Sequence, residues 1–145
     1  MLNGVFDEWG DASLDFYPED LRAEIDAINA RVYETLNNGI YRCGFAGTQG
    51  AYERAFDDLF ATLDWMEEIL SRRRWLAGSR QTEADWRAFP TLMRFDAVYH
   101  GHFKCNRRRI EDYENLSNYL RELFQTPGVA GSVNMHHIKW HYYHS

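Results

Sequence analysis

The sequence predicts an all-helical bundle, and three observations support this fold class. Residues 18–37 and 48–70 repeat apolar side chains every three or four positions, which is the spacing of one helix face. Residues 82–95 have the same spacing behind a residue suited to begin a helix. No stretch shows the alternation and flanking turn residues typical of a strand or hairpin. We therefore expect residues 1–145 to form one all-α domain, long enough to bury a single core.

The first long helix is expected to begin at Pro18, after a lead-in with a short helix within residues 1–17. Proline suits the first turn, where the acidic side chains of Glu19 and Asp20 favour the helix dipole. The helix should end near Asn37, and its apolar face is formed by Leu21, Ile25, Ile28, Val32 and Leu36. Residues 39–47, which are rich in glycine and aromatic residues, are expected to form a connector.

The second long helix is expected to follow Thr48, whose hydroxyl can accept from a free backbone N–H of the first turn. The basic residues 72–74 suit its C-terminal end, where they oppose the helix dipole. One face of this helix is apolar and consists of Tyr52, Ala55, Phe56, Leu59, Phe60, Leu63, Met66 and Leu70.

A capped helix from Thr82 is expected to be the central helix of the domain. Gly78 and Ser79 form the preceding turn, and Thr82 with Asp85 makes a short version of a capping box. Pro90 should kink this helix, because its ring removes one hydrogen bond and clashes with the preceding turn. We expect a stripe of bulky side chains to be buried on several sides: Trp86, Phe89, Leu92, Met93 and Phe95.

The last third of the chain is expected to hold shorter helices. An aromatic-rich segment, residues 98–106, precedes a helix from Asp112 through Leu123. Thr126 with Pro127 should begin a short helix, and Asn134 should cap a final one. Met135, Ile138 and Tyr142 share one side of that final helix.

Composition limits the possible functions. Hydrophobic content of 45%, with 16% aromatic residues, excludes a disordered chain. The net charge of −6 makes nucleic acid a poor partner. No stretch approaches the ~20 apolar residues that span a membrane. We therefore predict a protein without nucleic-acid or membrane partners.

The two cysteines, Cys43 and Cys105, are too few for a disulfide framework. Free thiols in a reducing cytoplasm are the expected state, with a single bridge as the alternative. Lys104 and Arg107 flank Cys105 and would lower its thiol pKa on close approach, but we expect neither cysteine to be a nucleophile. The basic residues 104–109 could meet an anion or form a solvated face.

Two groups of residues have spacings that suit a metal. His100, His102 and Cys105 are close in sequence, and His137 with His141 has the i, i+4 spacing of a helical pair. A structural zinc requires four ligands and a catalytic zinc usually three, and neither group supplies that number from one helix. We predict no metal and expect ordinary interfacial histidines.

Several motifs, in order along nearly the whole chain, resemble one family. The clearest are Tyr-Pro-Glu-Asp-Leu-Arg at 17–22, Asn-Asn-Gly-Ile-Tyr-Arg at 37–42, Arg-Phe-Asp-Ala-Val-Tyr at 94–99 and His-Ile-Lys-Trp-His-Tyr-Tyr at 137–143. With the capped helix from Thr82, they resemble the C-terminal helical domain of glutathione transferases, and within them the xi class, the glutathionyl-hydroquinone reductases. The departures are Gln81, where the family usually has an apolar residue, and the absence of the thioredoxin-like domain with its Cys-Pro-Trp motif.

The resemblance implies an activity for the whole protein. A cysteine thiolate of the thioredoxin-like domain attacks the sulfur of a glutathionyl-hydroquinone, hydroquinone leaves, and a second glutathione resolves the mixed disulfide. It further implies glutathione as co-substrate, bound mainly by that other domain, and a cytoplasmic homodimer. The helical domain would hold the quinone or hydroquinone ring, and it should be inactive alone. The alternative is a non-catalytic binding or assembly module.

Tyrosine suits such a pocket because its ring is a flat apolar surface and its hydroxyl donates to an oxygen that gains charge. The resemblance places Tyr41 and Tyr142 in the substrate pocket, with Tyr99 as a third wall residue. From the residues alone, each could instead pack in the core with its hydroxyl satisfied. We expect Tyr41 and Tyr142 to line one cleft although they are far apart in sequence, and Thr82 with Asp85 to have a structural role.

Overall fold

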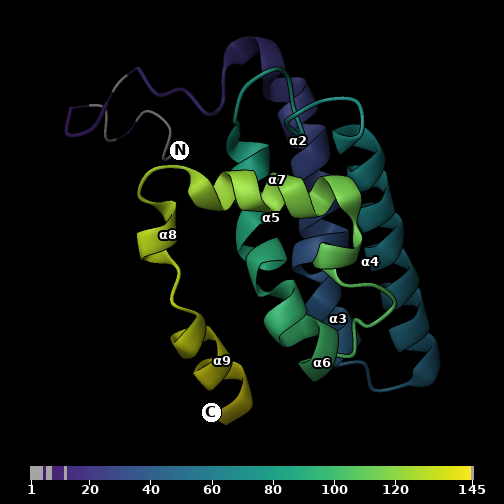
Figure 1. Ribbon diagram of the computed structural model, residues 1–145. Coiled ribbons are helices and arrows are strands. Elements are labelled where there is room, and N and C mark those ends of the chain that lie inside the picture. The colour runs from purple at the N-terminus through teal and green to yellow at the C-terminus, as the bar shows by residue number, and fades with distance from the viewer. Residues whose placement is uncertain (1–4, 6–7, 12, 145) are drawn as a thin grey trace.

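The computed structural model describes residues 5, 8–11 and 13–144, and within these it contains helices and no strand. The predicted all-helical fold is therefore confirmed (Figure 1). The elements are η1 (Glu19–Leu21), α2 (Arg22–Arg31), η2 (Val32–Asn37), α3 (Gly39–Gly44), α4 (Gln49–Leu70), α5 (Glu83–Arg94), η3 (Phe95–Tyr99), α6 (His100–His102), η4 (Ile110–Asp112), α7 (Glu114–Gln125), α8 (Val129–Ser132) and α9 (Met135–His144). The short helix expected within residues 1–17 lies partly outside the described residues.

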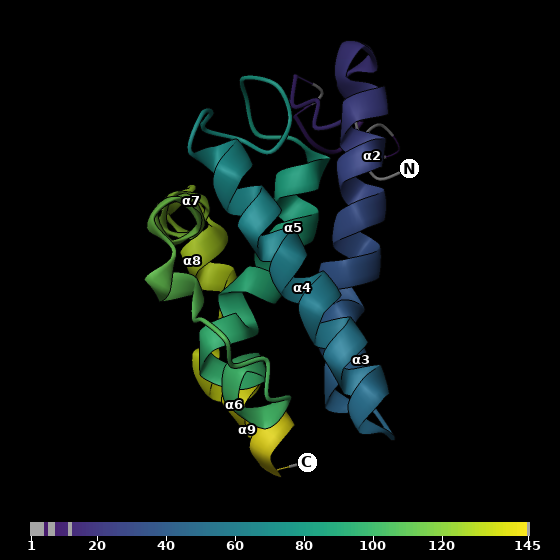
Figure 2. The same ribbon diagram turned by 90° about the vertical axis from the view of Figure 1, so that its right-hand side faces the viewer.

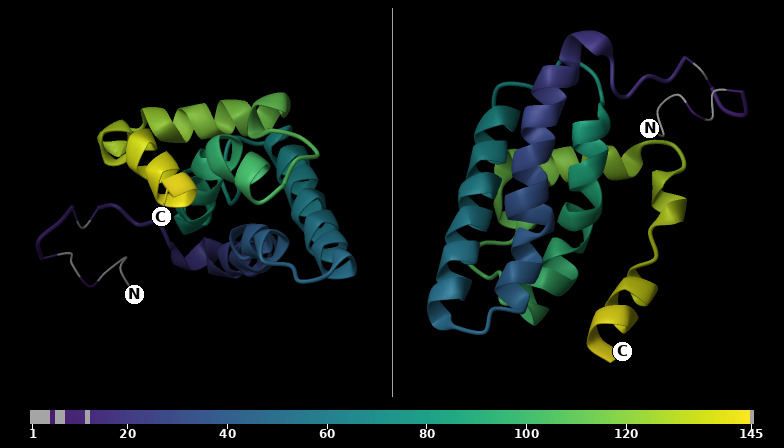
Figure 3. Two further views of the ribbon diagram at one scale, coloured as in Figure 1. Left: turned by 90° about the horizontal axis from the view of Figure 1, so that it is seen from below. Right: turned by 180° about the vertical axis from the view of Figure 1, so that it is seen from behind.

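Three helical rods run side by side along the length of the bundle (Figures 1 and 2). They are the run from α2 to α3, helix α4, and the run from α5 to α6. Helix α7 crosses them, and α9 returns to lie beside the end of the α5–α6 run, in contact with η3 (Figure 3). The core between the rods is fully apolar at its centre, with side chains that include Ile25, Leu36, Leu59, Phe60, Leu63, Leu92 and Phe95.

The connector expected at residues 39–47 is wrong in its first part, because Gly39–Gly44 form helix α3, and it is confirmed only at residues 45–47. Asn38 keeps right-handed helical dihedral angles, φ −83° and ψ −28°, so the chain does not leave the helix after Asn37. A π-helical stretch, η2, precedes α3 and changes the direction of its side chains by inserting wider turns. Ile40 and Cys43 are then buried against α4. Burial of this apolar face outweighs the local preference of asparagine and glycine for a helix end.

Helix α4 agrees with its prediction in its N-cap and its buried face. The N–H of Ala51 donates to Oγ1 of Thr48 at 3.2 Å, which satisfies one of the free amides of the first turn. The predicted apolar face is buried at Ala55, Leu59, Phe60, Leu63, Met66 and Leu70.

Helix α5 begins after Thr82 and continues through Pro90 to Arg94, where the π-helical η3 follows. Phe89, Leu92 and Phe95 of the expected stripe are buried, but Trp86 and Met93 are only half-buried, which corrects that part of the prediction. The Trp86 ring makes edge contacts with Phe16 and Phe89, at centroid distances of 6.4 and 5.8 Å. Helix α5 contacts α2 and α7, and its buried residues also include the smaller Ala84, Ala88 and Thr91.

A buried carboxylate lies at the start of α5. Oδ2 of Asp85 accepts from the N–H of Thr82 at 2.8 Å and from its hydroxyl at 3.2 Å. Oδ1 accepts from the N–H of Leu76 at 3.0 Å and from the hydroxyl of Tyr119 at 2.8 Å. Asp85 thus joins the turn after α4, the start of α5 and helix α7. Burial raises the pKa of Asp85, and the four hydrogen bonds oppose that rise.

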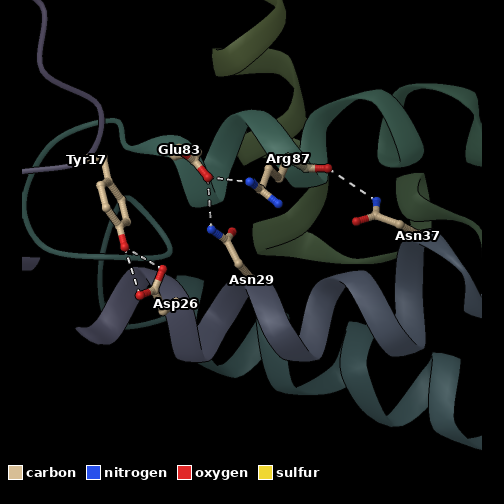
Figure 4. A network of polar contacts seen from close by, with 6 residues as sticks. All are labelled: Tyr17, Asp26, Asn29, Asn37, Glu83 and Arg87. Atoms are coloured by element: carbon tan, nitrogen blue, oxygen red, sulfur yellow. Dashed lines mark hydrogen bonds and ion pairs between the residues drawn. The ribbon is translucent and has the colours of Figure 1, made fainter. Parts of the chain in front are cut away.

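A polar seam connects α2 with α5 on the outside of the bundle (Figure 4). Glu83 accepts from the Asn29 amide at 3.4 Å and pairs with Arg87 at 2.6 Å. Farther along η2, the Asn37 amide donates to the backbone carbonyl of Arg87 at 3.2 Å and to Thr91 Oγ1 at 2.6 Å. These bonds fix the end of η2 against α5.

Two of the basic residues at 104–109 pair with the protein's own acidic groups. Arg107 pairs with Asp57 and Arg109 with Glu111, each at 2.6 Å. Farther along, Asn134 Oδ1 accepts from the N–H of His137 at 3.0 Å, which confirms the predicted cap of α9. None of the helices in the described part of the chain is long and apolar enough to cross a membrane.

Candidate functional site: a tyrosine pocket

Three tyrosines from separate elements meet at one end of the bundle. Tyr41 lies on α3, Tyr99 ends η3, and Tyr142 lies on α9. The hydroxyl of Tyr142 lies 2.8 Å from that of Tyr41 and 3.0 Å from that of Tyr99. The structure therefore brings together the three tyrosines singled out in the sequence, and the hydroxyls form a chain with Tyr142 at its centre.

The ring of Phe103 contacts the rings of all three tyrosines. It packs against Tyr41 at a centroid distance of 5.4 Å, against Tyr99 at 5.7 Å and against Tyr142 at 6.0 Å. Directly after Phe103, the chain turns at Lys104, which has a φ of 59°, a left-handed conformation uncommon outside glycine. The close approach of α3 also requires Gly44, because a Cβ there would lie 2.4 Å from the Phe103 ring.

The tyrosines open into a pocket of about 560 Å³ between α3, α5 and α9. Its described lining consists of Asn37, Asn38, Tyr41, Pro90, Thr91, Arg94, Tyr99, His137, Ile138, His141 and Tyr142. This volume and the combination of aromatic faces with hydroxyl, amide and imidazole groups suit an aromatic small molecule that carries polar substituents. The sequence analysis did not predict Arg94, Asn37 and Asn38 as pocket residues, nor the pocket positions of His137 and His141. The only available signal was that these residues lie within or beside the recognised motifs.

The three tyrosines differ in their exposure to solvent. Tyr99 is 3% exposed, whereas Tyr41 is 38% exposed. Burial raises the pKa of Tyr99 and that of Tyr142, and the hydrogen bond from each hydroxyl to a neighbour contributes further. Both hydroxyls are therefore protonated at neutral pH, so the cluster supplies donors rather than a phenolate.

Cys43 and Cys105 are free thiols, both buried, that contact one another behind the pocket. The hydrogen bond with Cys105 lowers the pKa of Cys43, while the same contact and burial raise the pKa of Cys105. Lys104 and Arg107, expected as possible activators, do not contribute to the thiol pKa of Cys105. Neither thiol lines the pocket.

The histidine groups considered for a metal do not converge in the described residues, where no three or more His, Cys, Asp or Glu side chains could hold an ion. His102 instead packs against Phe103 and Tyr143 with centroid distances of 5.1 and 5.2 Å. His136 stacks on Trp140 along the exposed side of α9.

A larger cavity lies at the opposite end of the bundle, beside the N-terminal segment. Its volume is about 1300 Å³, and Phe16, Trp75, Trp86 and Val129 contribute to its walls. None of the three predicted pocket tyrosines lies there. The tyrosine pocket is therefore the candidate site.

The packing of Gly44 gives a prediction about this site. Gly44→Ala should displace the Phe103 ring, because ring carbons lie at 2.4 and 2.5 Å from the new Cβ and a ring cannot bend away. We expect a loss of about 1–3 kcal/mol of unfolding free energy, the usual cost of overpacking. Gly47→Ala is the control, since no atom lies within 4 Å of a Cβ there. Urea unfolding measures both variants, and equal midpoints would contradict the close contact.

Comparisons with known proteins identify the family of the chain. The sequence model of one protein family, the glutathione S-transferase C-terminal domain, matches residues 49–122 of this chain. The chain belongs to this family. It is 61% identical to the glutathionyl-hydroquinone reductase PcpF of Sphingobium chlorophenolicum, over 100% of this chain and 46% of that protein.

Two solved structures are also similar. The glutathione-bound structure of YqjG from Escherichia coli K-12 has 47% identity and a TM-score of 0.95, over 98% of this chain and 46% of that one. A xi-class glutathione transferase from Natrialba magadii has 48% identity and a TM-score of 0.95, over 99% of this chain and 44% of that one. The chain thus spans less than half the length of these relatives, and its likeness is to the helical domain of the xi class.

Proposed function

We propose that this domain binds the ring of a quinone or hydroquinone in a glutathione-dependent reductase of glutathionyl-hydroquinones. The observation that carries the proposal is the chain of three hydroxyls joined by two hydrogen bonds. Three hydroxyls carry three protons, and two of these are used within the chain, so one O–H remains for an oxygen of a ligand. Because Tyr41 is the most exposed of the three, its hydroxyl is the natural donor.

The chemistry of the substrate suits these donors. In the proposed reaction, a thiolate of the thioredoxin-like domain attacks the sulfur of the glutathionyl group, the bond from sulfur to the ring breaks, and the ring takes up a proton and leaves as hydroquinone. The step proceeds from the keto tautomer of the ring, in which the electron pair of the broken bond passes into the neighbouring carbonyl to give a phenolate, and a fixed O–H donor stabilises that charge. The similarity to a reductase named for this reaction supports the assignment.

For the whole protein, we propose glutathione as co-substrate, held mainly by the thioredoxin-like domain, and a homodimer in the reducing cytoplasm. The resemblance to the xi class supports these proposals, as does the glutathione present in a similar structure. The two unpaired buried thiols suit a reducing compartment.

Ring binding is tested directly by titrating 1,4-dihydroxybenzene, kept reduced, into the purified chain and following the tyrosine ring signals by NMR. We expect the signals of Tyr41 and Tyr142 to shift, and Tyr41→Phe to weaken binding because the donor is lost. Tyr33→Phe is the matched control, since Tyr33 is 58% exposed and does not line the pocket. Shifts confined to Tyr33, or no saturable shift, would contradict the proposal.

The buried thiols give a further prediction. We expect the chain alone to show no reductase turnover, and neither Cys43 nor Cys105 to react with a thiol reagent before unfolding, because both are buried. In urea above the unfolding midpoint, both should react at the rate of a free cysteine. Hydroquinone release that is abolished by Cys105→Ser would show instead that this thiol is a nucleophile.

A further inference from the structure

The charge of the tyrosine pocket is one-sided. Among the described residues that line it, Arg94 supplies a guanidinium and His137 and His141 supply imidazoles, whereas aspartate and glutamate are absent. This contrasts with the chain as a whole, which carries a net charge of −6 at pH 7. A concave surface with a cation and no carboxylate concentrates a positive potential at the bound ligand.

Arg94 is held in place without being neutralised. It is the last residue of α5 and half-buried, and its Nη1 donates to the backbone carbonyl of Pro90 at 2.7 Å. No ion pair joins Arg94 to a carboxylate within the described part of the chain, whereas Arg87 on the same helix pairs with Glu83 at 2.6 Å. A guanidinium has five N–H donors, so most of those of Arg94 remain for a ligand.

The guanidinium also acts on the tyrosine cluster. Burial raises the pKa of Tyr142, and the positive charge of Arg94 partly offsets this rise. Arg94 lines the same pocket as the hydroxyls to which we assign the ring oxygen. A ligand bonded to the cluster would place a neighbouring ring substituent within reach of Arg94.

We infer that Arg94 determines specificity in this pocket by binding a carboxylate carried on the hydroquinone ring. This inference rests on the proposed function, because it takes ring binding at the tyrosines as given. A planar guanidinium matches the two oxygens of a carboxylate through paired hydrogen bonds, which a neutral substituent does not reproduce. The preferred substrates are then glutathionyl-hydroquinones with an acidic ring substituent.

The test compares two ligands of nearly equal shape, 2,5-dihydroxybenzoate and its neutral amide, 2,5-dihydroxybenzamide. Each is titrated by calorimetry or NMR into the purified chain and into Arg94→Met, Arg94→Lys and the control Arg121→Met. Arg121 lies exposed on α7, bonded to Asn118, and does not line the pocket. Urea midpoints establish that each variant is folded. If Arg94→Met does not fold, the binding of the two ligands is compared between the native chain and Arg94→Lys.

We expect the native chain to bind the carboxylate about tenfold more tightly than the amide, the lower range for a hydrogen bond to a charged group. Arg94→Met should abolish the preference and leave amide binding unchanged, Arg94→Lys should retain part of it, and Arg121→Met all of it. Amide binding without a preference for the carboxylate, or a preference that survives Arg94→Met and Arg94→Lys, would overturn the inference alone. If neither ligand binds the native chain, both the inference and the proposed function fail.

Discussion

Replacing Asp85 with alanine is expected to lower the unfolding free energy by about 3–5 kcal/mol. The substitution leaves the N–H groups of Leu76 and Thr82 and the hydroxyl of Tyr119 without their acceptor in a buried site. Each buried unsatisfied donor costs about 1–3 kcal/mol, and the relief of carboxylate desolvation offsets part of that sum. The loss follows from the position of Asp85, where one side chain joins the start of α5 to α7 and to the turn after α4.

Urea or thermal unfolding measures this effect, with Asp58→Ala as the matched control. Asp58 is exposed on α4, so its loss should change stability by less than about 0.5 kcal/mol. Tyr119→Phe removes only one of the four donors and should cost about 1–3 kcal/mol. An Asp85→Ala midpoint as close to the native value as that of Asp58→Ala would show that this network does not stabilise the fold.

In a two-domain enzyme reconstituted with its thioredoxin-like domain, Tyr142→Phe is expected to reduce kcat/KM by up to ~10²-fold. Tyr142 is the central hydroxyl, so its removal breaks both hydrogen bonds of the cluster and leaves the remaining donors without a fixed direction. The hydroxyl of Tyr99, 3% exposed, also loses its partner, which should cost about 1–3 kcal/mol of stability. Tyr41→Phe should reduce turnover with little change in stability, because Tyr41 is exposed.

Turnover is followed as hydroquinone release by chromatography, and stability as the urea midpoint. Tyr33→Phe controls for the loss of a tyrosine hydroxyl outside the pocket. A Tyr142→Phe enzyme that is destabilised but turns over at the native rate would mean that the cluster serves packing alone. That outcome would restore the interpretation that these tyrosines are core residues.

Local signals in the sequence were sufficient where structure depends on residues a few positions apart. The helices that begin after Thr48 and Asn134 were predicted from their caps, because the cap bonds join residues i and i+3. The apolar face of α4 was equally readable, since the burial of one helix face requires only the helical period. The motifs at 37–42 and 137–143 led to the family, which comparison then confirmed.

Errors occurred where a tertiary contact overrides a local preference. Asn37, Asn38 and Gly39 predict a helix end, yet burial of Ile40 and Cys43 against α4 keeps the chain helical. Trp86 predicts a buried ring by its size, yet it is only half-buried. The helical period indicates which side of a helix is apolar, but it does not report how completely neighbouring elements cover each residue on that side.

The sequence by itself determined the helical class, most helix starts and the choice of Tyr41, Tyr99 and Tyr142, because periodicity, caps and motifs are short-range properties. Only the tertiary structure decided that the three hydroxyls lie within 3.0 Å of their neighbours. It alone placed the unpaired guanidinium of Arg94 beside them and assigned Asp85 to a buried junction of three segments. The physical reason is that these arrangements depend on how separate helices pack against one another, and residues as far apart as Tyr41 and Tyr142 carry no local sign of their contact.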